Sequence, residues 1–374
     1  MSTATAKAQP GVSPSMSNVE AFQGRLLHSL SGAFDLFAIY LGDRLGFYHT
    51  LATHRPMTAA ELAQATRTHP RYVREWLEQQ AATGILEPMG GETADDRRYG
   101  ISAAHAEVLA DPESLNYLAP MAQILNGVVR PMDKLIAAFR SGGGVSWEEY
   151  GADAREGQAR INRTMFLQQL GQEWIPAMGD IHRRLGAPGA RVADIGCGAG
   201  WSGIGVARCY PTAQVDGFDL DEASIGMARA NARDYAVTDR VFFQHRDAAD
   251  PSLRGQYDLA MALECIHDMS NPVAALRTMR RMLKPGGAVL VVDERVNHTF
   301  QPGPHDPAGS DVDWMMYGWS ILCCLPAGMS EHPSACTGTV MRPETLERYA
   351  REAGFERFEI LPVDHLFFRF YRLG

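Results

Sequence analysis

Short apolar runs alternate with helical patterns along the second half of the chain. Apolar runs bounded by glycine or polar turns predict strands, and apolar positions three or four residues apart predict helices. Strands are predicted at Val192–Ile195, Gln214–Asp219, Val241–Gln244, Tyr257–Leu263, Ala288–Asp293, Phe355–Leu361 and Leu366–Leu373. Helices are predicted at Ser202–Tyr210, Glu222–Ala232, Pro272–Leu283 and Pro343–Ala353, and a turn at Lys284–Gly287. This alternation predicts an α/β fold built on a Rossmann-like, doubly wound sheet.

The first half of the chain predicts helices instead. Apolar residues at three- and four-residue steps give one wide apolar stripe on a helix from Val19 to Leu41. Thr58 and Glu61 have the spacing of a capping box that opens a second helix, and Pro70 opens a third. Two short apolar segments on either side of the polar stretch Gly90–Arg97 then predict a hairpin. Helix, helix and hairpin in this order are typical of a winged helix.

These patterns divide the chain into four parts. Residues 1–19 are rich in Ser, Ala and Pro and lack an apolar core, so they predict a disordered tail and not a signal peptide. We expect a winged-helix and dimerisation domain at 20–110, a helical linker and active-site cover at 111–171, and a catalytic domain at 172–374. A long insert in the catalytic domain, at about 297–339, predicts a lid. The stripe on the first helix is too apolar to remain in water and predicts a homodimer.

The composition is that of an ordinary globular protein. Of the 374 residues, 45% are hydrophobic and 21% are charged. A net charge of −9 argues against sequence-independent nucleic-acid binding, which needs a basic surface. The six cysteines show neither a Cys-x-x-Cys pair nor zinc-ligand spacing, so they indicate free thiols in a reducing cytoplasm rather than a metal site. No apolar run approaches the roughly 18 residues that a membrane span needs.

The winged-helix pattern raises the alternative of DNA binding. Between Met57 and Ile101 the chain has five arginines and no lysine, against seven acidic residues. Contacts from lysine and arginine to phosphates supply most of the affinity for DNA, and this segment lacks the charge for them. We therefore expect a dimerisation and substrate-lid module. The alternative from another functional class is a ligand-sensing transcription regulator, in which the second half of the chain serves as the receptor domain.

A glycine-rich turn follows the first predicted strand of the sheet. Asp194, Gly196, Gly198 and Gly200 come directly before a predicted helix, so bare backbone and a helix N-terminus would face a ligand. The glycines also fit a dinucleotide fingerprint that ends at Gly203. A carboxylate at Asp194, however, would repel a pyrophosphate and attract a ligand that carries an ammonium group and no phosphate. S-adenosylmethionine is such a ligand, and the stretch resembles motif I of the class I S-adenosylmethionine-dependent methyltransferases.

Two further acidic residues follow the next two predicted strands. Asp219, about 20 residues beyond the glycines, can accept hydrogen bonds from both ribose hydroxyls of an adenosine, whereas Asp221 suits a helix cap. Asp247 is placed to accept a hydrogen bond from the adenine amino group. Leu220 and Ala248, next to these carboxylates, complete the predicted adenosine site. The same order of motifs runs through the class I methyltransferases, and this resemblance implies S-adenosylmethionine as the cofactor.

A histidine motif lies just past the fourth predicted strand, at the edge of the sheet where such folds bind ligands. The stretch Ile266–Ser270 resembles the His-Asp-Trp-Ser stretch of small-molecule O-methyltransferases, and this resemblance implies that His267 is a general base. Asp268 or Asp293 is expected to orient its ring. The alternative is that His267 only lines the donor pocket. Glu264 is predicted to touch the donor or to guide a cationic substrate.

The whole chain resembles the bacterial methyltransferases that carry an N-terminal winged-helix domain. The likeness rests on the stretches Ala193–Gly198, Glu264–Met269 and Ala353–Phe355, and it implies methyl transfer to a small molecule. Five aromatic residues indicate either core packing or the walls of a site for a hydrophobic or aromatic acceptor: Tyr150, Trp174, Trp314, Tyr317 and Trp319. O-methylation with the histidine as base is favoured. The alternative is C- or N-methylation, in which Glu264 helps to position the substrate.

Overall fold

The computed structural model describes residues 16–250, 252, 255–303 and 311–374. The chain forms two compact units, Met1–Asp111 and Pro112–Gly374, which we describe separately. The division falls beside the predicted boundary at residue 110. Except for Asp111, the predicted cover at 111–171 belongs to the same unit as the sheet.

The first unit contains the predicted helices and hairpin. Its elements are α1 (Met16–Arg44), α2 (Phe47–Thr53), α3 (Ala59–Thr66), α4 (Pro70–Ala82), β1 (Glu87–Pro88), β2 (Tyr99–Gly100) and α5 (Ala103–Ala110). The two strands pair antiparallel. The short helices α2 and α5 were not predicted. Helix α1 begins at Met16, so the predicted disordered tail is wrong for residues 16–19, and its residues 1–15 lie outside the described part of the chain.

Thr58 and Glu61 form the predicted capping box at the start of α3. The Thr58 hydroxyl accepts a hydrogen bond from the Glu61 backbone N–H at 3.2 Å, and the Glu61 carboxylate accepts one from the Thr58 N–H at 2.8 Å. Arg98 donates to both oxygens of the same carboxylate. Arg71 and Arg74 also pair with acidic residues of this unit. Three of the five arginines considered for phosphate contacts are therefore already engaged.

Helix α1 carries an exposed apolar stripe. Nine of its large apolar side chains are exposed: Val19, Phe22, Leu26, Leu27, Leu30, Phe34, Leu36, Phe37 and Leu41. The helix nevertheless carries polar and charged residues throughout its length. Within the described residues, no helix is long and apolar enough to cross a membrane.

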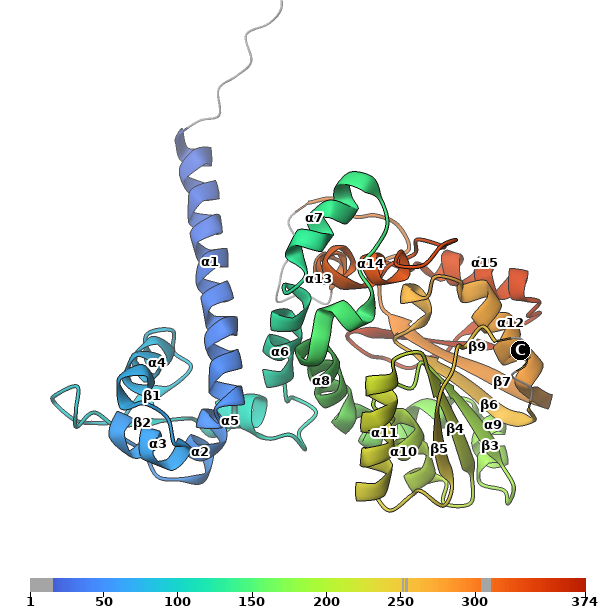
Figure 1. Ribbon diagram of the computed structural model, residues 1–374, viewed down its shortest axis with the longest axis horizontal. Coiled ribbons are helices and arrows are strands. Elements are labelled where there is room, and N and C mark those ends of the chain that lie inside the picture. The colour runs from blue at the N-terminus through green and yellow to red at the C-terminus, as the bar shows by residue number, and fades with distance from the viewer. Residues whose placement is uncertain (1–15, 251, 253–254, 304–310) are drawn as a thin grey trace, which may run out of the picture. The chain divides into compact units, whose positions relative to one another are not determined.

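The second unit is organised around a seven-stranded sheet (Figure 1). The strands are β3 (Arg191–Ile195), β4 (Gln214–Asp219), β5 (Val241–His245), β6 (Tyr257–Leu263), β7 (Leu283–Glu294), β8 (Phe358–Ile360) and β9 (Phe368–Leu373). Their order across the sheet is β5-β4-β3-β6-β7-β9-β8. Strands β3 to β7 are parallel, and β9 runs antiparallel to both β7 and β8. The predicted doubly wound sheet is confirmed.

Helices cover both faces of this sheet (Figure 1). The elements on one face are α9 (Gly179–Leu185), α10 (Trp201–Cys209), α11 (Glu222–Asp234) and the π-helix η1 (Phe166–Trp174). The elements on the other face are α12 (Pro272–Met282) and α15 (Pro343–Ala353). Successive residues of a strand face opposite layers, since Val192 packs in the first core and Ala193 in the second. Apolar residues on both faces explain why these strands read as continuous apolar runs.

The predicted turn at Lys284–Gly287 is not a separate turn, because it lies inside β7. The pairing with β6 jumps from Tyr257–Leu283 to Leu259–Ala288, so these residues form an irregular bulge in the strand. Gly286 has a φ of 75°, in the left-handed region that favours glycine. A bulge inserted into a continuous strand has the same glycine and proline signature as a turn, and sequence alone does not separate the two.

Two helical segments belong to the same unit as the sheet. The predicted cover contains α6 (Ala119–Val128), α7 (Met132–Ser141), α8 (Trp147–Met165) and most of η1, which ends three residues beyond the predicted boundary at 171. The short η2 (Ile175–Ala177) follows it. The insert forms α13 (Asp313–Trp319), the π-helix η4 (Ser320–Cys324) and α14 (Leu325–Gly328). The segments touch, because the Tyr150 hydroxyl donates to the carbonyl of Cys323 at 3.3 Å. Of the five aromatic residues singled out above, Trp174 is fully buried in the core, whereas Trp314 is 45% exposed.

Candidate active site

The predicted site residues gather along one edge of the sheet. Strands β3 and β6 are neighbours at the point where the strand order reverses, and open α/β sheets bind ligands outside the carboxyl ends of such strands. The glycine turn follows β3, Asp219 ends β4 and Asp247 follows β5. Glu264 and His267 follow β6. The topology therefore brings together residues that are far apart in the sequence.

The three glycines of the turn differ in their surroundings: two have close neighbours and the middle one has free space beside it. Gly196, Gly198 and Gly200 have φ values of 67°, 49° and 81°, which all lie in the left-handed region. A Cβ at Gly196 would lie 2.7 Å from the Cys265 Sγ, and one at Gly200 would lie 2.4 Å from the Phe243 ring. A Cβ at Gly198 would meet nothing within 4 Å. The outer glycines therefore permit close packing, and the middle one leaves open space beside the turn.

Asp194 lies beneath this turn and is 1% exposed. Its Oδ2 accepts a hydrogen bond from the Ser202 hydroxyl at 2.6 Å, at the start of α10. Its Oδ1 is buried and has no hydrogen-bond partner among the described residues. Burial raises the pKa of Asp194 to about 7. An unpartnered carboxylate oxygen at this place fits a ligand that brings a positive charge.

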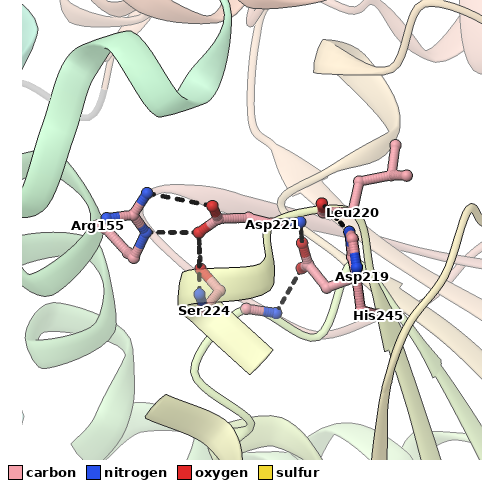
Figure 2. Close-up of polar contacts among 7 residues, drawn as sticks. Arg155, Asp219, Leu220, Asp221, Ser224 and His245 are labelled. Atoms are coloured by element: carbon pink, nitrogen blue, oxygen red, sulfur yellow. Dashed lines mark hydrogen bonds and ion pairs between the residues drawn. The ribbon is translucent and has the colours of Figure 1, made fainter. Parts of the chain in front are cut away.

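Asp219 faces the glycine turn (Figure 2). Its Oδ2 accepts from the Gly198 N–H and its Oδ1 from the Asp221 N–H, both at 2.8 Å. Asp221 caps α11, as predicted, by accepting from the Ser224 N–H at 3.0 Å. The Leu220 carbonyl accepts from the His245 ring at 2.8 Å, and the Leu220 side chain is exposed. The carboxylate predicted to bind ribose is therefore fixed from two sides by backbone N–H groups.

Asp247 lies in the loop after β5 and is exposed. Its Oδ1 accepts from the Ala249 N–H at 2.7 Å, which stabilises a local turn. Ala248 is partly buried and packs against the core on one face of the sheet. Binding of adenine by these two residues stays a prediction.

Glu264 has an unusual backbone and an unsatisfied side chain. Its φ of 56° places a non-glycine residue in the left-handed region, where strain is often associated with functional sites. Its Oε2 accepts from the Gln158 side chain at 3.0 Å, and Oε1 is buried without a partner among the described residues. Burial raises the pKa of Glu264 to about 7. Gln158, which reaches this site from helix α8, was not predicted, because no local pattern marks it.

His267 lies in the short helix η3 (Ile266–Asp268) and is 2% exposed. Its Nδ1 lies 2.8 Å from Oδ1 of Asp293 and 2.9 Å from Oε2 of Glu294. With its hydrogen on Nδ1, the ring donates to Asp293 and leaves Nε2 as a proton acceptor. Of the two carboxylates that the sequence left open, Asp293 is the one hydrogen-bonded to the ring. Burial raises the pKa of Asp268 to about 7.

The carboxylates beside the ring change its proton affinity. Burial alone lowers the pKa of His267, but the charges of Glu294 and Asp293 outweigh it and hold the pKa well above its usual value. Burial also disfavours the charged form of Asp293, yet its contact with His267 keeps its pKa low. The ring therefore has the environment of a strengthened base. Glu294 was not predicted as a site residue, although it directly follows Asp293.

The same three residues have the composition of a metal-ligand set. Among the described residues, ligand atoms of His267, Asp293 and Glu294 lie within 4.8 Å of one another. No metal site was predicted from the sequence. The distances from Nδ1 to the two carboxylate oxygens are those of a hydrogen bond and a close ion pair. Cys324, from the insert, is a further electrostatic influence on the ring and also raises the pKa of His267.

Comparisons with known proteins agree with this geometry. Residues 192–287 match the family described as a methyltransferase domain, and residues 33–111 match the Rv2258c-like winged HTH domain. The chain belongs to the class I S-adenosylmethionine-dependent methyltransferases with an N-terminal winged-helix domain. This methyltransferase is 28% identical over 187 residues to a ubiquinone biosynthesis O-methyltransferase of Aromatoleum aromaticum, covering 50% of this chain and 72% of the relative.

Two solved structures share the fold of this methyltransferase. The mitomycin 7-O-methyltransferase MmcR superposes with a TM-score of 0.69 at 20% identity, covering 96% of this chain and 99% of the other. Human N-acetylserotonin methyltransferase, solved in complex with S-adenosylmethionine, gives a TM-score of 0.64 at 19% identity, with 97% and 99% covered. S-adenosylmethionine is the cofactor of this methyltransferase. The open glycine turn and the unpartnered oxygens of Asp194 and Glu264 fit this cation.

Proposed function

We propose that this methyltransferase methylates a hydroxyl group of a small hydrophobic or aromatic acceptor, with His267 as the general base. The observation that carries the proposal is the buried hydrogen bond from Nδ1 of His267 to Asp293. It favours the ring form whose Nε2 accepts a proton. The relative and the MmcR structure named above are described as O-methyltransferases, which supports oxygen as the accepting atom.

The roles of the residues follow from their positions. When bound, S-adenosylmethionine supplies an already activated methyl group, so the protein contributes alignment and proton removal. In our proposal the glycine turn and Asp219 hold the adenosine part, with Leu220, Asp247 and Ala248 around it. His267 takes the hydroxyl proton at Nε2, and Asp293 stabilises the imidazolium that forms. Asp268 contributes to the polarity of the site from the same short helix.

A second candidate rests on Glu264. Its buried, unpartnered oxygen and left-handed backbone mark a place for a positive charge. If that charge belongs to the acceptor, Glu264 would position it for nitrogen or carbon methylation without a strong base. If it belongs to the donor, the oxygen proposal stands unchanged.

The test is a screen of phenols, amines and prenyl-type acceptors with isotopically labelled methyl donor. We expect the label on the oxygen of at least one phenol, located by fragmentation in mass spectrometry. The His267→Gln variant serves as the control for background methylation. Labelling of nitrogen or carbon alone, at rates untouched by that variant, would contradict the proposal and favour the Glu264 alternative.

We also propose a cytoplasmic homodimer built on helix α1. The nine exposed apolar side chains of this helix form a stripe that a second copy would cover. Light scattering should give twice the mass of one chain for the intact protein. Leu27→Glu combined with Phe34→Glu should give monomers, because it places charge in the stripe. Tyr72→Glu, at a residue 78% exposed on α4, should leave the mass unchanged. A monodisperse monomer of the parent protein would rule the dimer out.

A further inference from the structure

Helix α8 directs two polar side chains at opposite ends of the donor site. Arg155 and Gln158 are three residues apart, so they lie on the same side of the helix. Arg155 reaches Asp221, just after β4, and Gln158 reaches Glu264, just after β6. Asn162 lies one turn further along the same helix face. One helix outside the sheet therefore contacts the residues on both sides of the glycine turn.

The contact between Arg155 and Asp221 is a two-point ion pair (Figure 2). The Nε donates to Oδ2 at 2.5 Å and one terminal nitrogen donates to Oδ1 at 3.1 Å. The two side chains are only 13% and 14% exposed. Paired guanidinium and carboxylate groups fix orientation as well as distance, and solvent screens them weakly when they are buried.

The ion pair continues into the glycine turn through the backbone. The N–H of Asp221 donates to Oδ1 of Asp219, and Oδ2 of Asp219 accepts from Gly198. The orientation of the Asp219 carboxylate thus depends on where the backbone of Asp221 lies. Arg155 holds that backbone through the Asp221 side chain, which also caps α11.

We propose that Arg155 is a positioning residue for the methyl donor, which fixes the turn between β4 and α11 so that Asp219 is presented to the ribose of S-adenosylmethionine. The inference rests on the proposed role of Asp219 and not on the identity of the base. Arg155 itself touches neither the donor nor the reacting atoms in this scheme.

Loss of Arg155 would leave a partly buried carboxylate without its partner. Burial raises the pKa of Asp221, but its hydrogen bonds from Arg155 and Ser224 outweigh this and keep it low. Without the guanidinium, Asp221 must either bind a proton or turn toward water, because an unpaired buried charge is costly. Either change moves the backbone N–H that holds Asp219. Donor binding should suffer more than the methyl-transfer step.

The test compares Arg155→Met with Arg372→Met. Arg372, on β9, forms the same two-point ion pair with Asp180, on α9. Among the described residues, its printed side-chain hydrogen bonds go to Asp180 and not to the donor site. Calorimetry with S-adenosylhomocysteine should show a Kd raised about tenfold or more for Arg155→Met and within about twofold of the parent for Arg372→Met. Arg155→Lys, which keeps the charge but not the two-point geometry, should fall between the parent and the methionine variant.

Two further measurements separate positioning from general damage. In assays with an acceptor found by the screen, the KM for S-adenosylmethionine should rise while kcat stays within about threefold. Hydrogen exchange should show that S-adenosylhomocysteine protects residues 196–200 and 219–224 in the parent and much less in Arg155→Met. Parent-like affinity in Arg155→Met, or an equal loss in Arg372→Met, would overturn the proposal. Product binding needs no turnover, so this result is independent of whether His267 acts as a base.

Discussion

Replacing His267 with alanine should lower kcat by about 10²- to 10⁴-fold. A hydroxyl acceptor must lose its proton as the methyl group arrives, and Nε2 of His267 is the nitrogen that its hydrogen bond to Asp293 leaves available. The loss corresponds to roughly 3–5 kcal/mol of barrier. The Kd of S-adenosylhomocysteine should change little, because the glycine turn and Asp219 are built from other strands. Single-turnover rates with the donor Kd measured beside them are the test.

Two matched variants make the result specific. His267→Gln keeps a polar side chain of similar reach but offers no basic nitrogen, so it should be nearly as slow as the alanine variant. Glu264→Gln removes the acidic group of Glu264 and should act mainly on binding. A His267→Ala enzyme within about threefold of the parent, far short of the expected loss, would eliminate the histidine as base. A greater loss in Glu264→Gln would favour the positioning mechanism.

Much of the sheet and its site could be predicted from the sequence. Strands buried on both faces give continuous apolar runs, and glycine-rich turns mark their ends, so β4 and β6 have the predicted bounds. Because parallel strands end at one edge, Asp219 and His267 could be assigned to one site without a structure. The capping box of Thr58 and Glu61 could also be predicted, since its partners are only three residues apart in the sequence.

Contacts between segments that are distant in the sequence could not be predicted. Arg155 and Asp221 are 66 residues apart, and no local pattern distinguishes this arginine from others on a polar helix face. The choice between Asp268 and Asp293 depended on the direction of the His267 ring. The ring points at β7, where Asp293 lies, and this contact joins residues 26 positions apart. Glu294 was overlooked because alternation along a strand places its side chain opposite that of Asp293, yet both reach the ring at the strand end.

The pH dependence of the reaction should reveal the two carboxylates beside the ring. Only the neutral ring accepts a proton, so kcat should rise with pH and level off above the pKa of His267. Glu294 and Asp293 raise that pKa, and therefore they place the rise at a higher pH than an isolated imidazole would. Removing either negative charge should lower the pKa and move the rise to lower pH.

Asp293→Asn should combine this shift with a kcat about 10²-fold lower or more, even on the plateau. An asparagine can donate a hydrogen bond to Nδ1 of His267. This favours the ring form with its hydrogen on Nε2. In that form Nε2 cannot take the proton of the substrate hydroxyl. Glu294→Gln is the matched control, because it removes the neighbouring acid but keeps the hydrogen bond from Nδ1 to Asp293. Glu294→Gln should shift the rise of kcat to lower pH, with a much smaller loss of kcat on the high-pH plateau. Full pH profiles of kcat for the parent and both variants are the measurement. If Asp293→Asn retained the plateau rate of the parent, the hydrogen bond would hold the ring without selecting its reactive form.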